Sequence, residues 1–317
     1  MSEAISNRRA GVQPHLALIA VQLMFGTWPI VGKIALRALP ATGLVAFRVA
    51  GAATAFLFLL RLRGRIVVPP RGDLARFALY GLLGIVINQF LFVKGLELST
   101  VINATLLSTA IPVFALLVSV LLGLEKLSTR AALGMLVAAS GVVFLIDPLR
   151  ADFSGEKTLG NTLLVANTLA YGAYISISQD VFKRYGALTA MSWVFTFGCI
   201  IAVPLGGIQI AKVSPLSLEP AIWLAVAYII LVPTIGAYYL NAWALERVSP
   251  STVAVYIYLQ PLIAFAVAPL VLGADEQWTW HTSVSAALIF AGVAVVTLRS
   301  RSRTMEEVSE HPDALGH

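Results

Sequence analysis

The apolar stretch ATLLSTAIPVFALLVSVLLG (residues 104–123) contains a proline, Pro112, near its middle, and a second stretch repeats this arrangement. The second stretch is TVAVYIYLQPLIAFAVAPLVLG (residues 252–273), with Pro261 in the corresponding place. Each proline follows a Leu-Glu pair at the same interval, and each stretch ends in a glycine. The two pairs are Leu96-Glu97 and Leu245-Glu246. The chain therefore consists of two copies of one unit.

The composition indicates a membrane protein. Of the 317 residues, 58% are hydrophobic and 12% are charged, whereas about 25% of the residues of soluble globular proteins are charged. A soluble domain of this composition would lack the polar surface needed to cover its core. The net charge of +6 does not indicate nucleic-acid binding, because the basic residues lie in short segments between apolar runs and form no continuous face.

Residues that hold metals or carry out acid–base chemistry are scarce. Cys199 is the one cysteine, which rules out an intrachain disulfide and the CxxC spacing of metal sites. The four histidines lie near the ends of apolar runs or in the C-terminal tail. The sequence has no glycine-rich dinucleotide motif after a strand, no P-loop lysine motif and no nucleophile elbow. It therefore predicts neither enzymatic activity nor a bound cofactor or metal.

Apolar runs of membrane-spanning length divide the chain. A helix that crosses a bilayer needs about 20 mostly apolar residues, and we find ten such segments. They are approximately residues 15–37, 43–62, 74–97, 101–123, 130–146, 160–182, 188–209, 220–245, 252–273 and 280–299. We therefore predict an all-α, polytopic membrane protein with ten transmembrane helices and a disordered, polar tail over residues 300–317.

The distribution of basic residues orients the predicted spans. With a cytoplasmic N-terminus, most of the lysines and arginines between spans fall on the cytoplasmic side. Only Arg37, Arg150, Lys157 and Lys212 then fall on the outer side. Cytoplasmic loops carry an excess of Lys and Arg, so we expect both termini in the cytoplasm and the chain in the inner membrane of a bacterial cell.

The two units must cross the membrane in opposite directions, because each contains an odd number of spans. The first repeat covers residues 15–147 and the second covers residues 160–299. Further matches between them are Gly26 with Gly172, Asn88-Gln89 with Ala237-Tyr238, and Gly141-Val142 with Gly292-Val293. Inverted repeats are typical of secondary transporters, whose two halves rock around a central site.

Both halves carry a common series of motifs. In the first half they are Gly95-Leu96-Glu97, Asn103-Ala104, Pro112, Glu125-Lys126-Leu127, Gly134 and Gly141-Val142. In the second half they are Ala244-Leu245-Glu246, Tyr256, Gln260-Pro261, Glu276 and Gly292-Val293. Over nearly the whole chain these motifs resemble the EamA-type unit of the drug/metabolite transporter superfamily. The resemblance implies ten helices in two inverted repeats around a central cavity. It also implies transport, commonly export, of amino acids, other metabolites or toxic compounds.

Pro112 and Pro261 are predicted to kink two helices that line the cavity. Each lacks a backbone N–H and therefore leaves the carbonyl four residues earlier, that of Ser108 or Ile257, without its helical partner. Within a bilayer such a carbonyl needs another partner, and the kink would help a gate to bend. The alternative is a packing kink without a role in transport.

Polar and aromatic side chains near mid-membrane are candidates for the cavity wall. They are Trp28, Asn88, Gln89, Ser108, Tyr174, Tyr238, Tyr256, Tyr258 and Gln260. Amides in lipid are costly unless they pair, so we expect them to face the interior. Such a wall suits an amphipathic organic solute or a cation held by ring faces. For any single tyrosine, helix packing or the interfacial belt is the alternative.

Three basic residues, Lys33, Arg48 and Lys94, lie within predicted spans, in the outer third of the membrane. Lys33 and Lys94 could form an electropositive vestibule that attracts or releases an anionic group. The alternative is snorkelling of the long side chains to the interface. For Arg48 we favour snorkelling or a structural ion pair, and for Asp180 we favour an interfacial ion pair over proton coupling.

These features together predict a secondary transporter of a small organic metabolite, such as an amino acid or a related carboxylated or aromatic compound. The mechanism would be alternating access, and the resemblance implies export. An exporter of drugs or organic cations is the main alternative, while a passive channel or a membrane-embedded enzyme is less favoured. The expected partners are a small-molecule substrate and the lipid bilayer, without nucleic acid. A homodimer is left open.

Overall fold

The computed structural model describes residues 2–63, 68–123, 128–146, 155–211, 213, 218–245, 247, 256–273, 279–292 and 294–295. The sequence features at Glu125, Glu246, Glu276 and Val293, and the tail 300–317, lie outside these residues.

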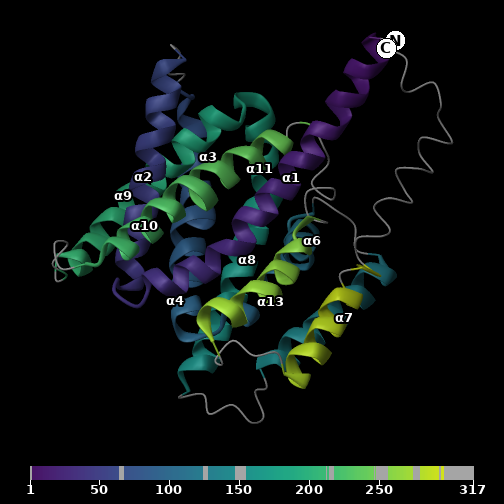
Figure 1. The fold of residues 1–317 in the computed structure, drawn as a ribbon. Coiled ribbons are helices and arrows are strands. Elements are labelled where there is room, and N and C mark those ends of the chain that lie inside the picture. Colours follow the sequence, from purple (N-terminus) through teal and green to yellow (C-terminus); the bar gives the residue numbers. More distant parts are fainter. Residues whose placement is uncertain are drawn as a thin grey trace.

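Helices that pack side by side form the described part of the chain, which holds no strand (Figure 1). Those of the first half are α1 (Ser2–Ala35), α2 (Ala41–Leu62), α3 (Arg71–Gly81), α4 (Asn88–Leu98), α5 (Val101–Ser108), α6 (Ile111–Leu121) and α7 (Thr129–Ile146). Those of the second half are α8 (Glu156–Tyr185), α9 (Ala187–Ile210), α10 (Pro220–Ile229), α11 (Ala237–Leu245), α13 (Leu259–Leu272) and a helical segment at 280–292.

Within the described residues, six of the ten predicted spans form helices long and apolar enough to cross a membrane. They are Val12–Ala35, Ala41–Leu62, Arg71–Leu98, Val101–Leu121, Ala187–Ile210 and Pro220–Leu245. Two shorter apolar helices cover Ala132–Leu145 and Leu259–Leu272. Helix α8 has 30 residues, but polar side chains such as Asn161, Asn167 and Gln179 make it less apolar. The protein is thus an all-helical, multi-pass membrane protein.

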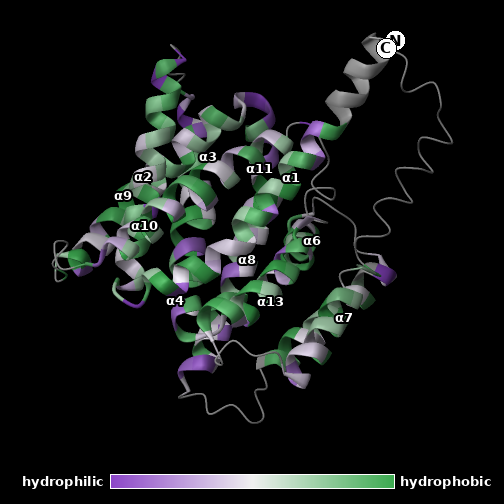
Figure 2. Cartoon of the chain, in the orientation of Figure 1, coloured by the Kyte–Doolittle hydropathy of each residue, from purple (hydrophilic) through white to green (hydrophobic). Residues whose placement is uncertain are grey.

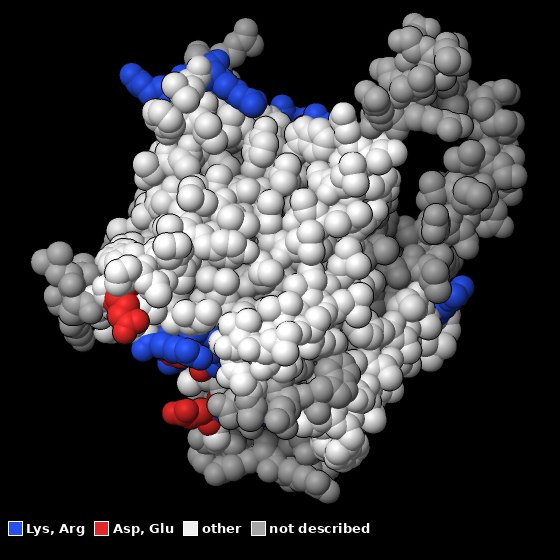
Figure 3. Space-filling model, viewed as in Figure 1, with Lys and Arg blue, Asp and Glu red and all other residues white. Residues whose placement is uncertain are grey.

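The surface is that of a protein in a bilayer. Apolar residues cover the middle of the helices, and hydrophilic residues gather nearer their ends (Figure 2). On the face drawn in Figure 3, charged residues lie mostly along the upper edge and toward the lower left, with a broad uncharged band between them. Phe58, Leu224 and Leu270 are largely exposed. Contiguous apolar surface of this kind is unfavourable in water and matches a hydrocarbon environment.

Matching glycines of the two halves permit matching helix contacts. A Cβ at Gly26 of α1 would lie 2.8 Å from Ile263 of α13, and a Cβ at Gly172 of α8 would lie 3.1 Å from Phe114 of α6. Ile263 and Phe114 each follow the proline of their stretch by two residues. The α1–α13 contact and the α8–α6 contact are therefore counterparts. At one edge of the bundle, α7 lies beside the segment 280–292 (Figure 1).

Each of the two prolines stands in the first turn of a helix, directly after an interruption of its predicted span. Helix α5 ends at Ser108 and α6 begins at Ile111, so Pro112 stands in the first turn of a new helix. Pro261 stands in the first turn of α13, which begins at Leu259. A first-turn residue has no intrahelical N–H bond to lose, so proline is well tolerated there.

Among the residues that the structure describes, each half also contains one π-helical segment. These segments are η1 (Leu82–Ile87), between α3 and α4, and η3 (Ile230–Gly236), between α10 and α11. π-Helical turns are rare and occur frequently at functional sites. Gln89 and Tyr238, which match each other in the repeat, each lie two residues beyond their π-helix.

Candidate functional site

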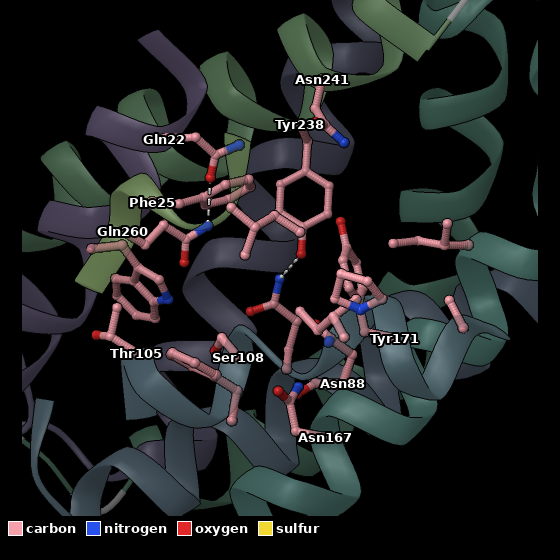
Figure 4. A pocket seen from close by; sticks show the side chains of 18 of the residues that line it. Gln22, Phe25, Asn88, Thr105, Ser108, Asn167, Tyr171, Tyr238, Asn241 and Gln260 are labelled. Atoms are coloured by element: carbon pink, nitrogen blue, oxygen red, sulfur yellow. Dashed lines mark hydrogen bonds between the residues drawn. The ribbon is translucent and has the colours of Figure 1, made fainter. Parts of the chain in front are cut away.

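A cavity of about 500 Å³ lies in the centre of the bundle, within the usual size range of ligand sites. Side chains from both halves converge on it (Figure 4). Its polar lining comprises Gln22, Arg48, Asn88, Gln89, Thr105, Ser108, Ser119, Asn167, Tyr171, Ser176, Gln179, Tyr238, Asn241 and Gln260. Apolar lining residues include Phe25, Trp28, Phe92, Ile111 and Leu116.

The cavity brings together most of the predicted mid-membrane residues. Those that line it are Trp28, Asn88, Gln89, Ser108, Pro112, Tyr238 and Gln260. Tyr174 lines a small neighbouring pocket, which shares Tyr171 and Tyr238 with the cavity. The remaining predicted residues lie outside the described lining: Lys33, Lys94, Tyr256, Tyr258 and Pro261.

Hydrogen bonds across the cavity join the two halves. Gln89 Nε2 donates to Tyr238 Oη at 3.0 Å, which links the two matching positions beyond the π-helices. Gln260 Nε2 donates to Gln22 Oε1 at 2.6 Å, and both bonds are drawn in Figure 4. Mutual pairing of this kind satisfies amides that would be costly in lipid.

A further hydrogen bond involves the backbone beyond η1. Asn167 Nδ2 donates to the carbonyl oxygen of Asn88 at 2.8 Å, between α8 and α4. Both residues are buried. The side chain of α8 thus fixes the wall of the cavity directly after the irregular segment of the neighbouring helix.

The sequence did not single out one face of α8 as a whole, although Tyr171 is among its mid-membrane aromatic residues. Asn167, Tyr171, Ile175 and Gln179 all line the cavity, and their spacing of four residues places them on one side of the helix. Polar residues at this interval in an otherwise apolar helix were the available signal. Gln22, Thr105 and Asn241 also line the cavity without having been predicted, and each is an isolated polar residue in an apolar run.

The two predicted vestibule lysines gather around Glu97, near the end of α4. Lys94 forms an ion pair with the carboxylate of Glu97, and Lys33 Nζ donates to the carbonyl oxygen of Glu97 at 3.2 Å. About half of the Lys94 side chain, 51%, is exposed. The positive charges therefore lie outside the cavity, and attraction of a substrate by these lysines stays a prediction.

The two predicted tyrosines near the start of α13 make packing contacts. Tyr256 Oη lies 2.8 Å from Nδ1 of His15 in α1. The ring of Tyr258 meets that of Phe290 edge to face, with centroids 5.7 Å apart. Both placements correspond to the helix-packing alternative for single tyrosines rather than to a cavity wall.

Arg48 departs furthest from expectation. Its side chain is only 1% exposed, and its guanidinium carbon lies 3.8 Å from the centroid of the Trp28 ring. Nε donates to Thr234 Oγ1 at 3.0 Å. Among the described residues no carboxylate forms an ion pair with it. Arg48 therefore does not snorkel, and it forms no ion pair with a carboxylate of the described residues.

The sequence did hold a signal for the burial of Arg48. Leu44, Val45 and Ala52 lie three or four residues away on the same face of α2, and all three are apolar and buried. An arginine on such a face cannot reach the interface without leaving its neighbours.

At the α4 C-terminal end of the bundle, α4 and α8 pack closely. A Cβ at Gly160 would lie 2.8 Å from the backbone carbon of Leu98. Beside this contact, Ser99 Oγ donates to Asn161 Oδ1 at 2.5 Å, and Asn103 Nδ2 donates to the same oxygen at 3.2 Å. Helices α4 and α8 are therefore in direct contact at this end of the bundle.

An ion-pair network joins α3 to the other end of α8. Arg76 contacts Asp180 at 3.1 Å, and Arg184 contacts Asp73 at 3.1 Å. Tyr185 Oη donates to the Asp73 carboxylate at 2.6 Å, and this bond raises the pKa of Tyr185. The ion pair predicted for Asp180 is confirmed.

Comparison with known proteins agrees with the motifs in the sequence. The model of the EamA-like transporter family matches residues 13–147 and 158–298. An uncharacterized transporter of Archaeoglobus fulgidus is 23% identical over 90% of this chain and 97% of its own length. A probable terminal-alkyne amino-acid exporter of Streptantibioticus cattleyicolor is 28% identical over 75% of this chain and 78% of its own length. A solved crystal structure, 21% identical, shares the fold with a TM-score of 0.63 over 91% of this chain and 98% of that one.

Proposed function

This chain belongs to the EamA-like transporter family, and we propose that it exports a small organic metabolite, such as an amino acid or a related carboxylated or aromatic compound. In this proposal the substrate binds in the central cavity. The observation that carries it is the convergence of amide, hydroxyl and aromatic groups from both halves on one cavity of about 500 Å³. A relative named as a probable amino-acid exporter agrees with this substrate class.

The chemistry of the wall fits a solute with an apolar body and a few polar groups. Phe25 and Phe92 offer ring surface to the apolar part. Tyr171 and Asn241 line the cavity (Figure 4). Within the described part of the chain, neither side chain has a hydrogen-bond partner of its own. Both can therefore bond to a solute without breaking an existing contact.

Transport would occur by alternating access between two inverted repeats, residues 15–147 and 160–299, with ten membrane-spanning helices in all. The counterpart contacts of Gly26 and Gly172 and the π-helix in each half support this arrangement. Two related halves that rock about a central site expose it to each side in turn. The close packing at Gly160 would then belong to a state in which that end is shut.

We place both termini in the cytoplasm and the protein in the inner membrane of a bacterial cell. The support is the distribution of Lys and Arg between the predicted spans, because cytoplasmic loops are enriched in these residues. In this orientation Gly160 lies near the outer surface, and the Asp73–Arg184 ion pair lies near the inner one.

Solute counterflow in proteoliposomes tests the proposal. The full-length protein is reconstituted, loaded with a panel of amino acids and aromatic carboxylates, and assayed for saturable exchange of the labelled compound. Asn241→Trp, which fills the cavity, should abolish exchange, whereas Leu224→Trp on the exposed apolar surface should retain it. Flux that does not saturate, or exchange that survives in Asn241→Trp, would contradict a carrier with this cavity as its site.

A further inference from the structure

We propose that Arg48 binds the carboxylate of the transported solute, so that the cavity selects organic anions over organic cations and neutral analogues. This inference rests on the proposed function, since it assigns a chemical role within the same cavity. Its starting point is a buried cation that lines the cavity and has no acidic partner among the described residues.

The guanidinium of Arg48 is fixed on two sides. The ring of Trp28 covers one face, with 3.8 Å between the guanidinium carbon and the ring centroid. Nε is bound to Thr234 Oγ1. Nη1 is buried and has no hydrogen-bond partner in the described part of the chain. The group is thus held in position with donor capacity left over.

Thr234 is itself positioned by the irregular helix that contains it. Its hydroxyl donates to the carbonyl oxygen of Ile229 at 2.6 Å, five residues earlier, within the widened turns of η3. A hydroxyl that donates there can accept from Arg48 Nε. The π-helix therefore contributes to the orientation of the arginine before any solute binds.

The remaining donors suit a carboxylate. A guanidinium presents its N–H groups in one plane, in a fork that matches the two oxygens of a carboxylate. With Nε occupied by Thr234, the terminal nitrogens are the donors left for a ligand. Charge-assisted bonds of this kind are about twice as strong as bonds between neutral groups.

The charge of the cavity favours an anion. No aspartate or glutamate stands among the described residues of the lining, and Arg48 is the charged residue there. An uncompensated charge in a low-dielectric interior is costly to maintain, and ionisable residues within membrane-spanning segments generally mark substrate or ion pathways. A bound carboxylate would supply the missing compensation, whereas a cation would be repelled.

The second half shows that helix packing alone does not need this arginine. Arg48 lies three residues before Gly51, and Phe195 lies three residues before Gly198. The two glycines are counterparts, since a Cβ on either would lie 2.7 Å from an isoleucine side chain in the π-helix of the other half. A phenylalanine is therefore sufficient at this place in the fold, and the charge in the first half serves another purpose.

Three isosteric probes test the inference. Phenylpropionate, phenylpropionamide and phenylpropylamine share an apolar body and differ in charge. Their binding to the purified full-length protein in lipid nanodiscs is measured by calorimetric titration, for the wild type and for Arg48→Gln. The control is Arg61→Gln, which removes the same charge from an exposed site on the same helix.

We expect phenylpropionate to bind the wild type more tightly than either analogue. Arg48→Gln should weaken its binding roughly 10-fold or more, the usual effect of losing a hydrogen bond to a charged group, while Arg61→Gln leaves it unchanged. Arg48→Lys keeps the charge but lacks the planar fork of donors, so its affinity for phenylpropionate should lie between those of the wild type and Arg48→Gln. If Arg48→Gln does not fold, the affinity of Arg48→Lys for phenylpropionate is compared with that of the wild type instead, and an unchanged affinity would contradict the inference.

Two results would overturn the inference and leave the proposed function standing. They are equal binding of the three probes to the wild type, and undiminished binding of phenylpropionate to Arg48→Gln. A wild-type protein that binds none of the three would overturn both the inference and the assignment of the cavity as a site for organic metabolites.

Discussion

Replacing Gly160 with alanine should open the end of the bundle where α4 and α8 meet. The added Cβ would lie 2.8 Å from the backbone carbon of Leu98 and 3.0 Å from the backbone oxygen of Gly95. A side chain in such a position could rotate away, but backbone atoms can move only with their whole helix. The two helices must therefore separate to accommodate one methyl group.

The size of the effect follows from this steric conflict. Inserting an extra carbon into a well-packed contact costs about 1–3 kcal/mol. The cost applies to the state in which the helices touch and is absent once they separate. An energy difference of this size shifts the equilibrium between the two states by roughly 5- to 150-fold toward the separated one.

Thiol labelling measures this shift. In a Cys199→Ala background, a cysteine at position 99 reports on the contact, because Ser99 is 5% exposed and hydrogen-bonded to Asn161. When opening is fast relative to labelling, the labelling rate tracks the open population. Adding Gly160→Ala should therefore raise the rate by roughly 5- to 150-fold, up to the limit set by a fully open state.

The matched control is Gly207→Ala in α9, where an added Cβ would meet nothing within 4 Å. It should leave labelling at position 99 unchanged. The reasoning is refuted if Gly160→Ala labels at the parental rate, or if Gly207→Ala accelerates labelling to the same extent.

Three further predictions concern other parts of the molecule. Tyr238→Phe leaves the amide of Gln89 without its acceptor and should lower the free energy of unfolding by about 1–3 kcal/mol, seen as a lower thermal unfolding temperature. Adding Gln89→Leu to this variant should recover part of the lost stability. Strict additivity of the two substitutions would contradict direct pairing of the side chains. Asp73→Asn should make the unfolding temperature less sensitive to added salt, because salt screens exposed ion pairs; equal salt dependence in both proteins would count against the network. Cysteines within residues 63–71 should label from the cytoplasmic side and those within 150–157 from the outside, and the reverse pattern would overturn the orientation.

The depth of each residue along its helix could be read from the sequence, but its rotational position could not. Lys94 and Arg48 are both basic residues within apolar runs. One faces outward and pairs with Glu97, and the other is buried against Trp28. Only the packing of α2 against its neighbours separates the two cases, although the apolar neighbours of Arg48 gave a hint of it.

Local irregularities limited the prediction further. The helix break after Ser108 could be anticipated from Pro112, because proline lacks the N–H that would bond to the Ser108 carbonyl and its ring clashes with that carbonyl. No such signal announced η1, whose six residues, Leu82–Ile87, are ordinary apolar residues and one glycine. A regular period of 3.6 residues cannot be extended through a π-helix, so the faces of α4 and α11 were not predictable from those of α3 and α10.

The hydrogen bond between Gln89 and Tyr238 depends on the π-helix in each half and reflects the duplication of the unit. An extra residue in a turn rotates everything beyond it by about 100° around the helix axis. Without η1 and η3, these two side chains would take other directions around their helix axes. The same irregularity stands at the same place in both halves, as expected if one insertion preceded the duplication of the unit. The bond thus joins two residues that descend from one position of the ancestral unit.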